Sequence, residues 1–288
     1  MFSDLPIEII KHEIFSHLDE SSKLVLRNVL WNTPIPIRID EIIQKEICKY
    51  STNYLIFFQS RIDIRDFSSY LARHGNLLGL KWSRDRGIPW SDKTCRSAAL
   101  GSYFELLKWA HENGCPWDKS TCEAAAGNND LTMLKWLREN GCPWDEETSS
   151  NAAFYGHLII VKWLRENGCP WDEETSSNAA FSGNFNMVKW LRENGCPWTE
   201  ETCTDAALGG HLEVLKWLRK NGCPWDKNTC LSAIDCHDIE VFKWVIENGC
   251  PCSWDKKHFE YAVPEIIKWS RDKGYLDGTD DDFHYMKI

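Results

Sequence analysis

Cysteine is the residue with the most obvious chemical potential in this sequence, because 13 cysteines could bind a metal or form disulfides. Most of them are periodic. One set follows the glycine of a recurring segment: Cys115, Cys142, Cys169, Cys196, Cys223 and Cys250. A second set comprises Cys95, Cys122, Cys203 and Cys230, and serine takes the same place at positions 149 and 176. Neither a zinc ligand nor a disulfide partner tolerates serine, and the sequence has no Cys-x-x-Cys pair. We therefore expect small, buried, reduced thiols and no metal site.

The other residues that could do chemistry give no catalytic pattern. The sequence has no glycine-rich phosphate loop, no nucleophile elbow and no zinc motif. The nine histidines are scattered, or stand like His157 and His211 directly before apolar runs, where we expect them to cap helices. We expect neither an enzyme nor a cofactor.

An internal repeat organises the sequence that positions these residues. A Lys-Trp pair recurs with steps of 27 residues six times and then 25, ending at Trp82, Trp109, Trp136, Trp163, Trp190, Trp217, Trp244 and Trp269. A fixed period of about 20–50 residues is typical of repeat proteins, in which each unit buries its apolar face against its neighbours.

Residues 144–171 serve as the reference unit. Asp145 is a good N-cap, and the pattern predicts a first helix over residues 146–155. Gly156 ends it in a left-handed turn, and a second helix follows over residues 158–166. Asn167-Gly168 and Pro170 end the second helix. The fold class is therefore all-α, a solenoid of helix-turn-helix repeats in which we expect the tryptophans to form the core between units.

The segment from Thr202 to Gly222, Thr-x-x-x-Ala-Ala-x-x-Gly-His-Leu-Glu-Val-Leu-Lys-Trp-Leu-x-x-Asn-Gly, resembles the ankyrin repeat. It is most similar to the short, tryptophan-rich ankyrin-type repeats of giant DNA viruses, some of which follow an F-box. The resemblance covers residues 63–276 as eight repeats. The unit is shorter than the usual length of about 33 residues, and the difference falls in the loop, so we expect little or no strand. The resemblance implies that the first helices line a partner-binding surface.

The N-terminal segment contains Leu-Pro-x-Glu-Ile, Ile-Phe-Ser-x-Leu-Asp and Leu-x-Leu-Arg-x-Val in order. These motifs resemble an F-box over residues 1–33, followed by a helical linker or degenerate cap over residues 34–62. The resemblance implies docking on a Skp-family adaptor of a cullin-type ubiquitin ligase. The implied contacts are Leu5, Pro6, Ile9, Ile14, Leu18, Leu24 and Val29. Alternatively, two helices in this segment cap the solenoid.

The composition restricts the partners. A net charge of −10 disfavours nucleic acid and anionic membranes. Asp4 and Glu8 are wrong for a signal peptide, and no apolar run has the length of a membrane span. We expect a cytoplasmic or nuclear monomer, in the host cell if the chain is viral, with an acidic tail over residues 277–288.

A helical wheel of the first helix predicts where a target binds. Thr148, Ala152 and Ala153 share the side that packs inward, whereas Asn151 and Phe154 lie opposite. Along the array, this opposite side predicts a target-binding stripe of Leu100, Asn151, Phe154, Asn178, Phe181, Asp205 and Leu208. Alternatively, position 154 tucks beneath a neighbouring unit. The chain is then an adaptor that brings a target protein to a ubiquitin ligase, or a scaffold or host-protein decoy without that link.

Overall fold

The computed structural model describes residues 64–85, 87–253 and 256–276, and it divides the chain into two compact units. The boundary between residues 121 and 122 falls inside a helix. The calls on residues 1–33 and 34–62 lie outside the described residues, so the F-box remains a prediction.

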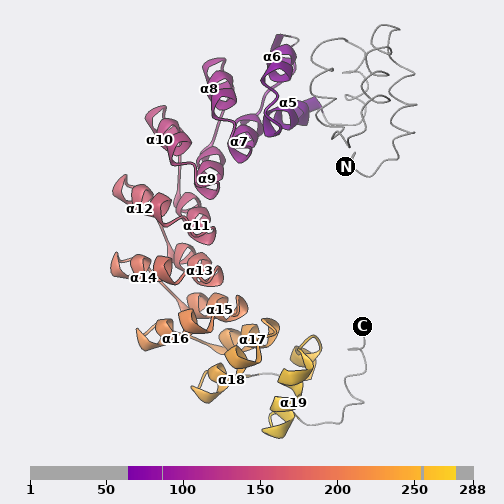
Figure 1. Cartoon of the computed structure of the whole chain (residues 1–288), viewed down its shortest axis with the longest axis vertical. Helices are drawn as coiled ribbons and strands as arrows, with labels where there is room; N and C mark the ends of the chain where they lie inside the picture. The colour runs from indigo at the N-terminus through magenta and orange to yellow at the C-terminus, as the bar shows by residue number, and fades with distance from the viewer. Residues whose placement is uncertain (1–63, 86, 254–255, 277–288) are drawn as a thin grey trace, which may run out of the picture. The chain divides into compact units, whose positions relative to one another are not determined.

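Every regular element in the described part of the chain is a helix (Figure 1). The first unit contains α5 (Ile64–Arg73), α6 (Leu77–Asp85), α7 (Asp92–Leu100) and α8 (Phe104–Glu112). The boundary helix is α9 (Lys119–Gly127). The second unit continues with α10 (Leu131–Glu139), α11 (Glu146–Phe154), α12 (Leu158–Glu166), α13 (Glu173–Phe181), α14 (Phe185–Glu193), α15 (Glu200–Leu208), α16 (Leu212–Lys220), α17 (Lys227–Asp235), α18 (Ile239–Glu247), the 3-10 helix η1 (Lys256–Phe259) and α19 (Pro264–Asp272). The prediction of an all-α fold of paired helices is confirmed.

Two of the first helices, α13 and α17, begin with a reciprocal cap. In α13, the Asp172 carboxylate accepts a hydrogen bond from the Thr175 N–H at 3.2 Å, and the Thr175 hydroxyl accepts one from the Asp172 N–H at 3.4 Å. Both N–H groups lack an intrahelical partner, so this exchange stabilises the helix start.

The second helix ends at a recurring Asn-Gly pair. At the end of α12, the Asn167 amide donates to the Trp163 carbonyl at 2.8 Å. The Cys169 N–H reaches back to the Leu164 carbonyl at 2.9 Å. This closure needs a left-handed residue between them, and Gly168 supplies it with φ 81°.

Small residues set the spacing of the first helices in the second unit. Ala152 and Ala153 of α11 are fully buried, and so are their counterparts in α13 and α15. These helices therefore pack side by side in a row, α11 on α13 and α13 on α15, whereas α12, α14 and α16 lie farther apart (Figure 1). The row presents one continuous face of first helices.

The tryptophans differ from the expectation of a buried core. The tryptophans whose burial the structure describes are half-buried, and the described interior consists instead largely of alanine, aliphatic residues, methionine and cysteine. The guanidinium of Arg165 on α12 lies 4.2 Å from the ring centre of Trp171, which meets the edge of Trp190 on α14 at 5.8 Å. The tryptophans do join neighbouring repeats, but they do so as a partly exposed ladder with cation–π contacts. Each such contact contributes about 0.5–1 kcal/mol at exposed sites.

In the first unit, one step of this ladder has a histidine in place of the arginine. His111 of α8 stacks on Trp117 with ring centres 3.5 Å apart and planes 7° apart. Burial lowers the pKa of His111, so the stacked imidazole tends toward its neutral form.

Candidate protein-binding surface

The periodic cysteines are buried in the interior of the repeats. Ser149 donates to Cys169 Sγ at 3.4 Å, and the Cys169 thiol donates to the Asp145 carbonyl at 3.3 Å. Burial raises the pKa of Cys169 to about 12. The hydrogen bond with Cys142, together with burial, raises the pKa of Cys122 as well. Thiols of this kind are poor nucleophiles and poor metal ligands at neutral pH, as their alternation with serine predicts.

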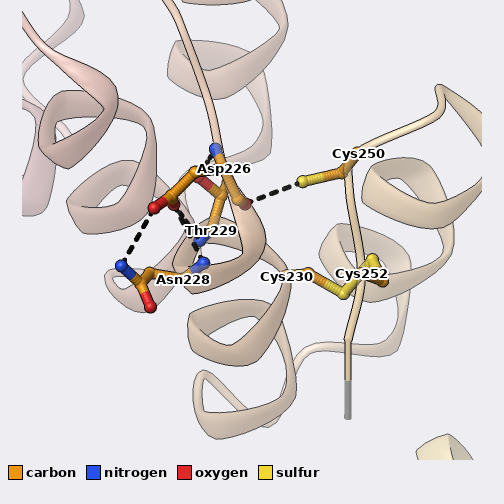
Figure 2. Close-up of a disulfide and its surroundings, with 6 residues drawn as sticks. All are labelled: Asp226, Asn228, Thr229, Cys230, Cys250 and Cys252. Carbon is orange, nitrogen blue, oxygen red and sulfur yellow. Dashed lines mark hydrogen bonds between the residues drawn. A yellow bond between two sulfur atoms is a disulfide. The ribbon is translucent and has the colours of Figure 1, made fainter.

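The expectation of free thiols throughout is wrong at the C-terminal end of the array. Cys230 forms a disulfide with Cys252, with Cα atoms 5.6 Å apart (Figure 2). Cys250, the periodic cysteine that follows Cys230, does not form this bond and instead donates its S–H to the Asp226 carbonyl at 3.2 Å. Cys252 and Ser253 form a two-residue insertion between Pro251 and Trp254, where the other repeats have Pro followed directly by Trp. An argument from periodic positions therefore could not find Cys252.

Three carboxylates lie close together on α11 and the segments before it. Oxygen atoms of Glu123, Asp145 and Glu147 are all within 4.8 Å of one another. Exposed acidic groups often cluster in this way without binding an ion. We therefore treat them as part of the negative charge of the first-helix face.

Three columns of equivalent residues form this face on α11, α13 and α15, and we call it the first-helix surface. Its members are four and three residues apart, which places them on one side of each helix. The carboxylate column is Glu147, Glu174 and Glu201, the central column is Asn151, Asn178 and Asp205, and the apolar column is Phe154, Phe181 and Leu208. The glutamates and Leu208 are exposed, Leu208 to 40%, and the other members are half-buried. On the opposite side of α11, Thr148, Ala152 and Ala153 are fully buried, so the predicted orientation of the helix is confirmed.

The apolar column brings two predicted residues together. The rings of Phe154 and Phe181 stack with centres 5.8 Å apart and planes 13° apart. Each ring is half-buried, so position 154 leans on its neighbour and still keeps a solvent-accessible edge. The ring is thus neither fully tucked beneath the neighbouring repeat nor fully exposed, and a role in target binding stays a prediction.

The asparagines of the central column are held by the fold. The Asn178 amide donates to the Ser150 hydroxyl of α11 at 3.3 Å, and the Asn151 amide donates to the Glu147 carbonyl at 3.1 Å. They fix the spacing and orientation of the column.

Asp205 differs from the asparagines above it. Burial raises the pKa of Asp205 to about 6, and the charges of Glu201 and Glu174 add to this effect. Within the described residues, no lysine, arginine or histidine lies within ion-pair distance of its carboxylate. A half-buried carboxylate beside two others is costly to keep ionised, which sets Asp205 apart from the exposed glutamates.

The remaining predicted residues lie elsewhere. Leu100 ends α7 in the first unit and is half-buried. The predicted adaptor contacts, from Leu5 to Val29, lie outside the described residues. His157 stands at the start of α12 as expected, but its side chain does not cap that helix, because Nε2 lies 2.9 Å from the Gly127 carbonyl.

Sequence reasoning missed two exposed apolar residues next to this surface. Tyr155 is 58% exposed and Ile159 is 71% exposed. Ile159 occupies a position where the other described pairs from α8 onward have glutamate, threonine or asparagine: Glu105, Thr132, Asn186, Glu213, Glu240 and Glu265. Comparing this column across the repeats would have revealed it.

The structure thus defines an all-α array of paired helices with an exposed face of mixed apolar and acidic character. No known protein-family profile matches the chain, and no curated protein matches it. Among solved structures, the chain is similar to the ankyrin repeat domain of human ASB11, with 19% sequence identity and a TM-score of 0.49, over 66% of this chain and all of that one. None of the helices in the described ranges combines the length and apolarity that crossing a bilayer requires.

Proposed function

We propose that this chain is a non-catalytic adaptor that binds a target protein on its first helices and presents it to a cullin-type ubiquitin ligase. The observation that carries the binding role is the stacked pair of Phe154 and Phe181 on the face opposite the buried alanines. These rings are not among the buried core residues of the helix pairs. Large apolar side chains left partly in water are typical of interaction sites.

The proposed target contacts are those of the predicted stripe. On the second unit they are Asn151, Phe154, Asn178, Phe181, Asp205 and Leu208, and on the first unit Leu100. Asparagine and phenylalanine suit this role, because an aromatic ring supplies area while the polar neighbours supply hydrogen bonds at the rim.

The ligase link rests on the N-terminal motifs. Their order supports an F-box that binds a Skp-family adaptor through Leu5, Pro6, Ile9, Ile14, Leu18, Leu24 and Val29. The short tryptophan-rich repeats support a viral origin, in which case the complex forms in the cytoplasm or nucleus of the host.

Calorimetric titration of a purified Skp-family adaptor into the full-length chain tests the link. We expect binding by the wild type and its loss in Leu5→Ala/Pro6→Ala, with the unfolding transition of the repeats unchanged. A control substitution outside the motifs, Glu20→Gln, should bind normally. A wild-type chain that does not bind the adaptor contradicts the ligase link.

The second candidate is a scaffold or host-protein decoy without a ligase link. It is favoured by the position of the first-helix surface, all of which lies on α11, α13 and α15 and none on the N-terminal segment. A chain that binds a target but no Skp-family adaptor would have this function.

A further inference from the structure

We infer that the first-helix surface binds a basic segment of its partner, with an arginine side chain set against Glu174, Glu201 and Asp205 and apolar side chains against Phe154, Phe181 and Leu208. This inference rests on the proposed function and adds the chemistry of the target.

This surface carries more negative charge than stabilisation of the helix N-termini accounts for. Two glutamates begin each of α11, α13 and α15, where the helix dipole stabilises them. Asp205 has no such explanation, because it lies in the C-terminal half of α15, where the dipole disfavours a carboxylate. The same position holds Asn151 in α11 and Asn178 in α13. An amide therefore suits the fold, and the carboxylate calls for another reason.

The surroundings of Asp205 point to a cation. Its carboxylate is half-buried beside Glu201 and Glu174, and the ion pairs described in the second unit, Lys216 with Glu213 and Lys243 with Glu240, lie elsewhere. A positively charged side chain from a partner would relieve both the repulsion and the cost of burial. Charge pairs that become desolvated at an interface can be strongly coupled.

The adjacent rings favour arginine within the partner. A guanidinium is planar, stacks on aromatic faces and forms paired hydrogen bonds with carboxylates. The chain already uses this contact on its other side, where Arg192 lies 3.9 Å from the ring centre of Trp198. The stacked Phe154 and Phe181 lie in the column next to the carboxylates, so one arginine-bearing segment with apolar neighbours can meet both columns.

Panning a random 12-residue peptide library on the full-length chain tests the inference without knowledge of the target. We expect enriched peptides that combine arginine with apolar residues. Their affinity for Asp205→Asn, measured by fluorescence anisotropy, should fall by about tenfold or more, since losing one desolvated charge pair costs at least about 1.4 kcal/mol. The matched control Glu166→Gln, which removes an exposed carboxylate from α12, should change the affinity less than about twofold, as expected for rim charges. Asp205→Asn introduces the residue found in α13, so it should fold, and its melting curve checks this.

The outcomes separate this inference from the proposed function. If the enriched peptides are neutral or acidic and do not bind Phe154→Ala/Phe181→Ala, the inference is contradicted, but the target-binding surface is supported. Basic peptides that bind both variants as well as the wild type would contradict the inference and the surface together. Calcium chloride alone, titrated calorimetrically, should not bind in a manner sensitive to Asp205→Asn. Calcium binding that is lost in Asp205→Asn would show that the surface binds a metal ion, and would contradict the inference of a peptide partner. If panning on the wild type enriches no peptide beyond those enriched on Phe154→Ala/Phe181→Ala, the inference is overturned.

Discussion

Phe154 and Phe181 occupy the same position in successive repeats, and their rings stack face to face with centres 5.8 Å apart. Neither ring belongs to the alanine-rich core beneath it, and neither is fully exposed. This contact connects the fold with the proposed function, because the close packing of the small residues brings two aromatic side chains of neighbouring units onto one face.

Truncation of the two rings should cost little stability. We predict that Phe154→Ala/Phe181→Ala lowers the free energy of unfolding by clearly less than the sum expected for two buried rings, which is about 3–5 kcal/mol each. Urea denaturation measures this loss. The control is Leu164→Ala, because Leu164 is fully buried and its truncation should cost about 2–5 kcal/mol. A loss at or above the buried-ring value would show that the rings are core residues.

Asp205 should make stability depend on pH in a specific direction. Burial and the neighbouring Glu201 and Glu174 raise the pKa of Asp205 from 3.8 to about 6, so between these values the folded state holds the proton more strongly than the unfolded state. This contribution to stability is therefore present at low pH and is lost as pH rises through about 6.

At pH 7 the Asp205 carboxylate is ionised at a cost to the folded state, and Asp205→Asn removes that cost. We therefore predict a higher melting temperature than the wild type at pH 7 and a smaller difference near pH 4. Circular dichroism melts of both proteins from pH 4 to 8 give the comparison, in which carboxylates elsewhere cancel. The same pH-dependent difference in Glu166→Gln, or none in Asp205→Asn, would contradict the assigned cause.

The disulfide should stabilise the C-terminal repeats. Reduction of Cys230–Cys252, which spans 22 residues, should lower the stability of this end of the array by about 2–4 kcal/mol. Cys252→Ser should show the same loss and no further response to reductant, whereas Cys236→Ser should respond like the wild type, because Cys236 is a free thiol. Thiol titration in denaturant should find two fewer reactive cysteines before reduction than after it, and equal numbers would contradict the pairing.

A left-handed histidine is a further site where the fold is strained. His237 has φ 60° in the turn position that Gly156, Gly183 and Gly210 occupy in other repeats. We predict that His237→Gly raises the free energy of unfolding by about 1 kcal/mol, because it relieves a conformation that disfavours a side chain. Asn129→Gly, at the equivalent turn with φ 59°, should gain less, since asparagine tolerates this region. Chemical denaturation distinguishes these outcomes, and a less stable His237→Gly would contradict the argument.

Local signals in the sequence predict the helices well, because caps and turns act within a few residues. The first helix of the reference unit was expected over residues 146–155 and runs from Glu146 to Phe154, and the second matches at both ends. The wheel also placed Ala152 and Phe154 on opposite sides, as the burial of the alanine confirms.

Features that depend on contacts between repeats were harder to predict. The Arg165–Trp171 stack depends on the path of the loop between units, and so the tryptophans were wrongly assigned to the core. The effect of Glu174 on Asp205 depends on the register between α13 and α15, which no single repeat contains. The Cys252 pairing arises in an insertion that breaks the period.

The affinity of one partner peptide for the wild type and for Phe154→Ala/Phe181→Ala tests the central claim most directly. The peptide is one enriched from the library, and its binding is measured by fluorescence anisotropy beside a melting curve of each protein. The account predicts that the affinity falls by about tenfold or more, which corresponds to at least about 1.4 kcal/mol, while the melting temperature changes little. An unchanged affinity, or a loss that accompanies collapse of the melting transition, would contradict a binding role for the first-helix surface.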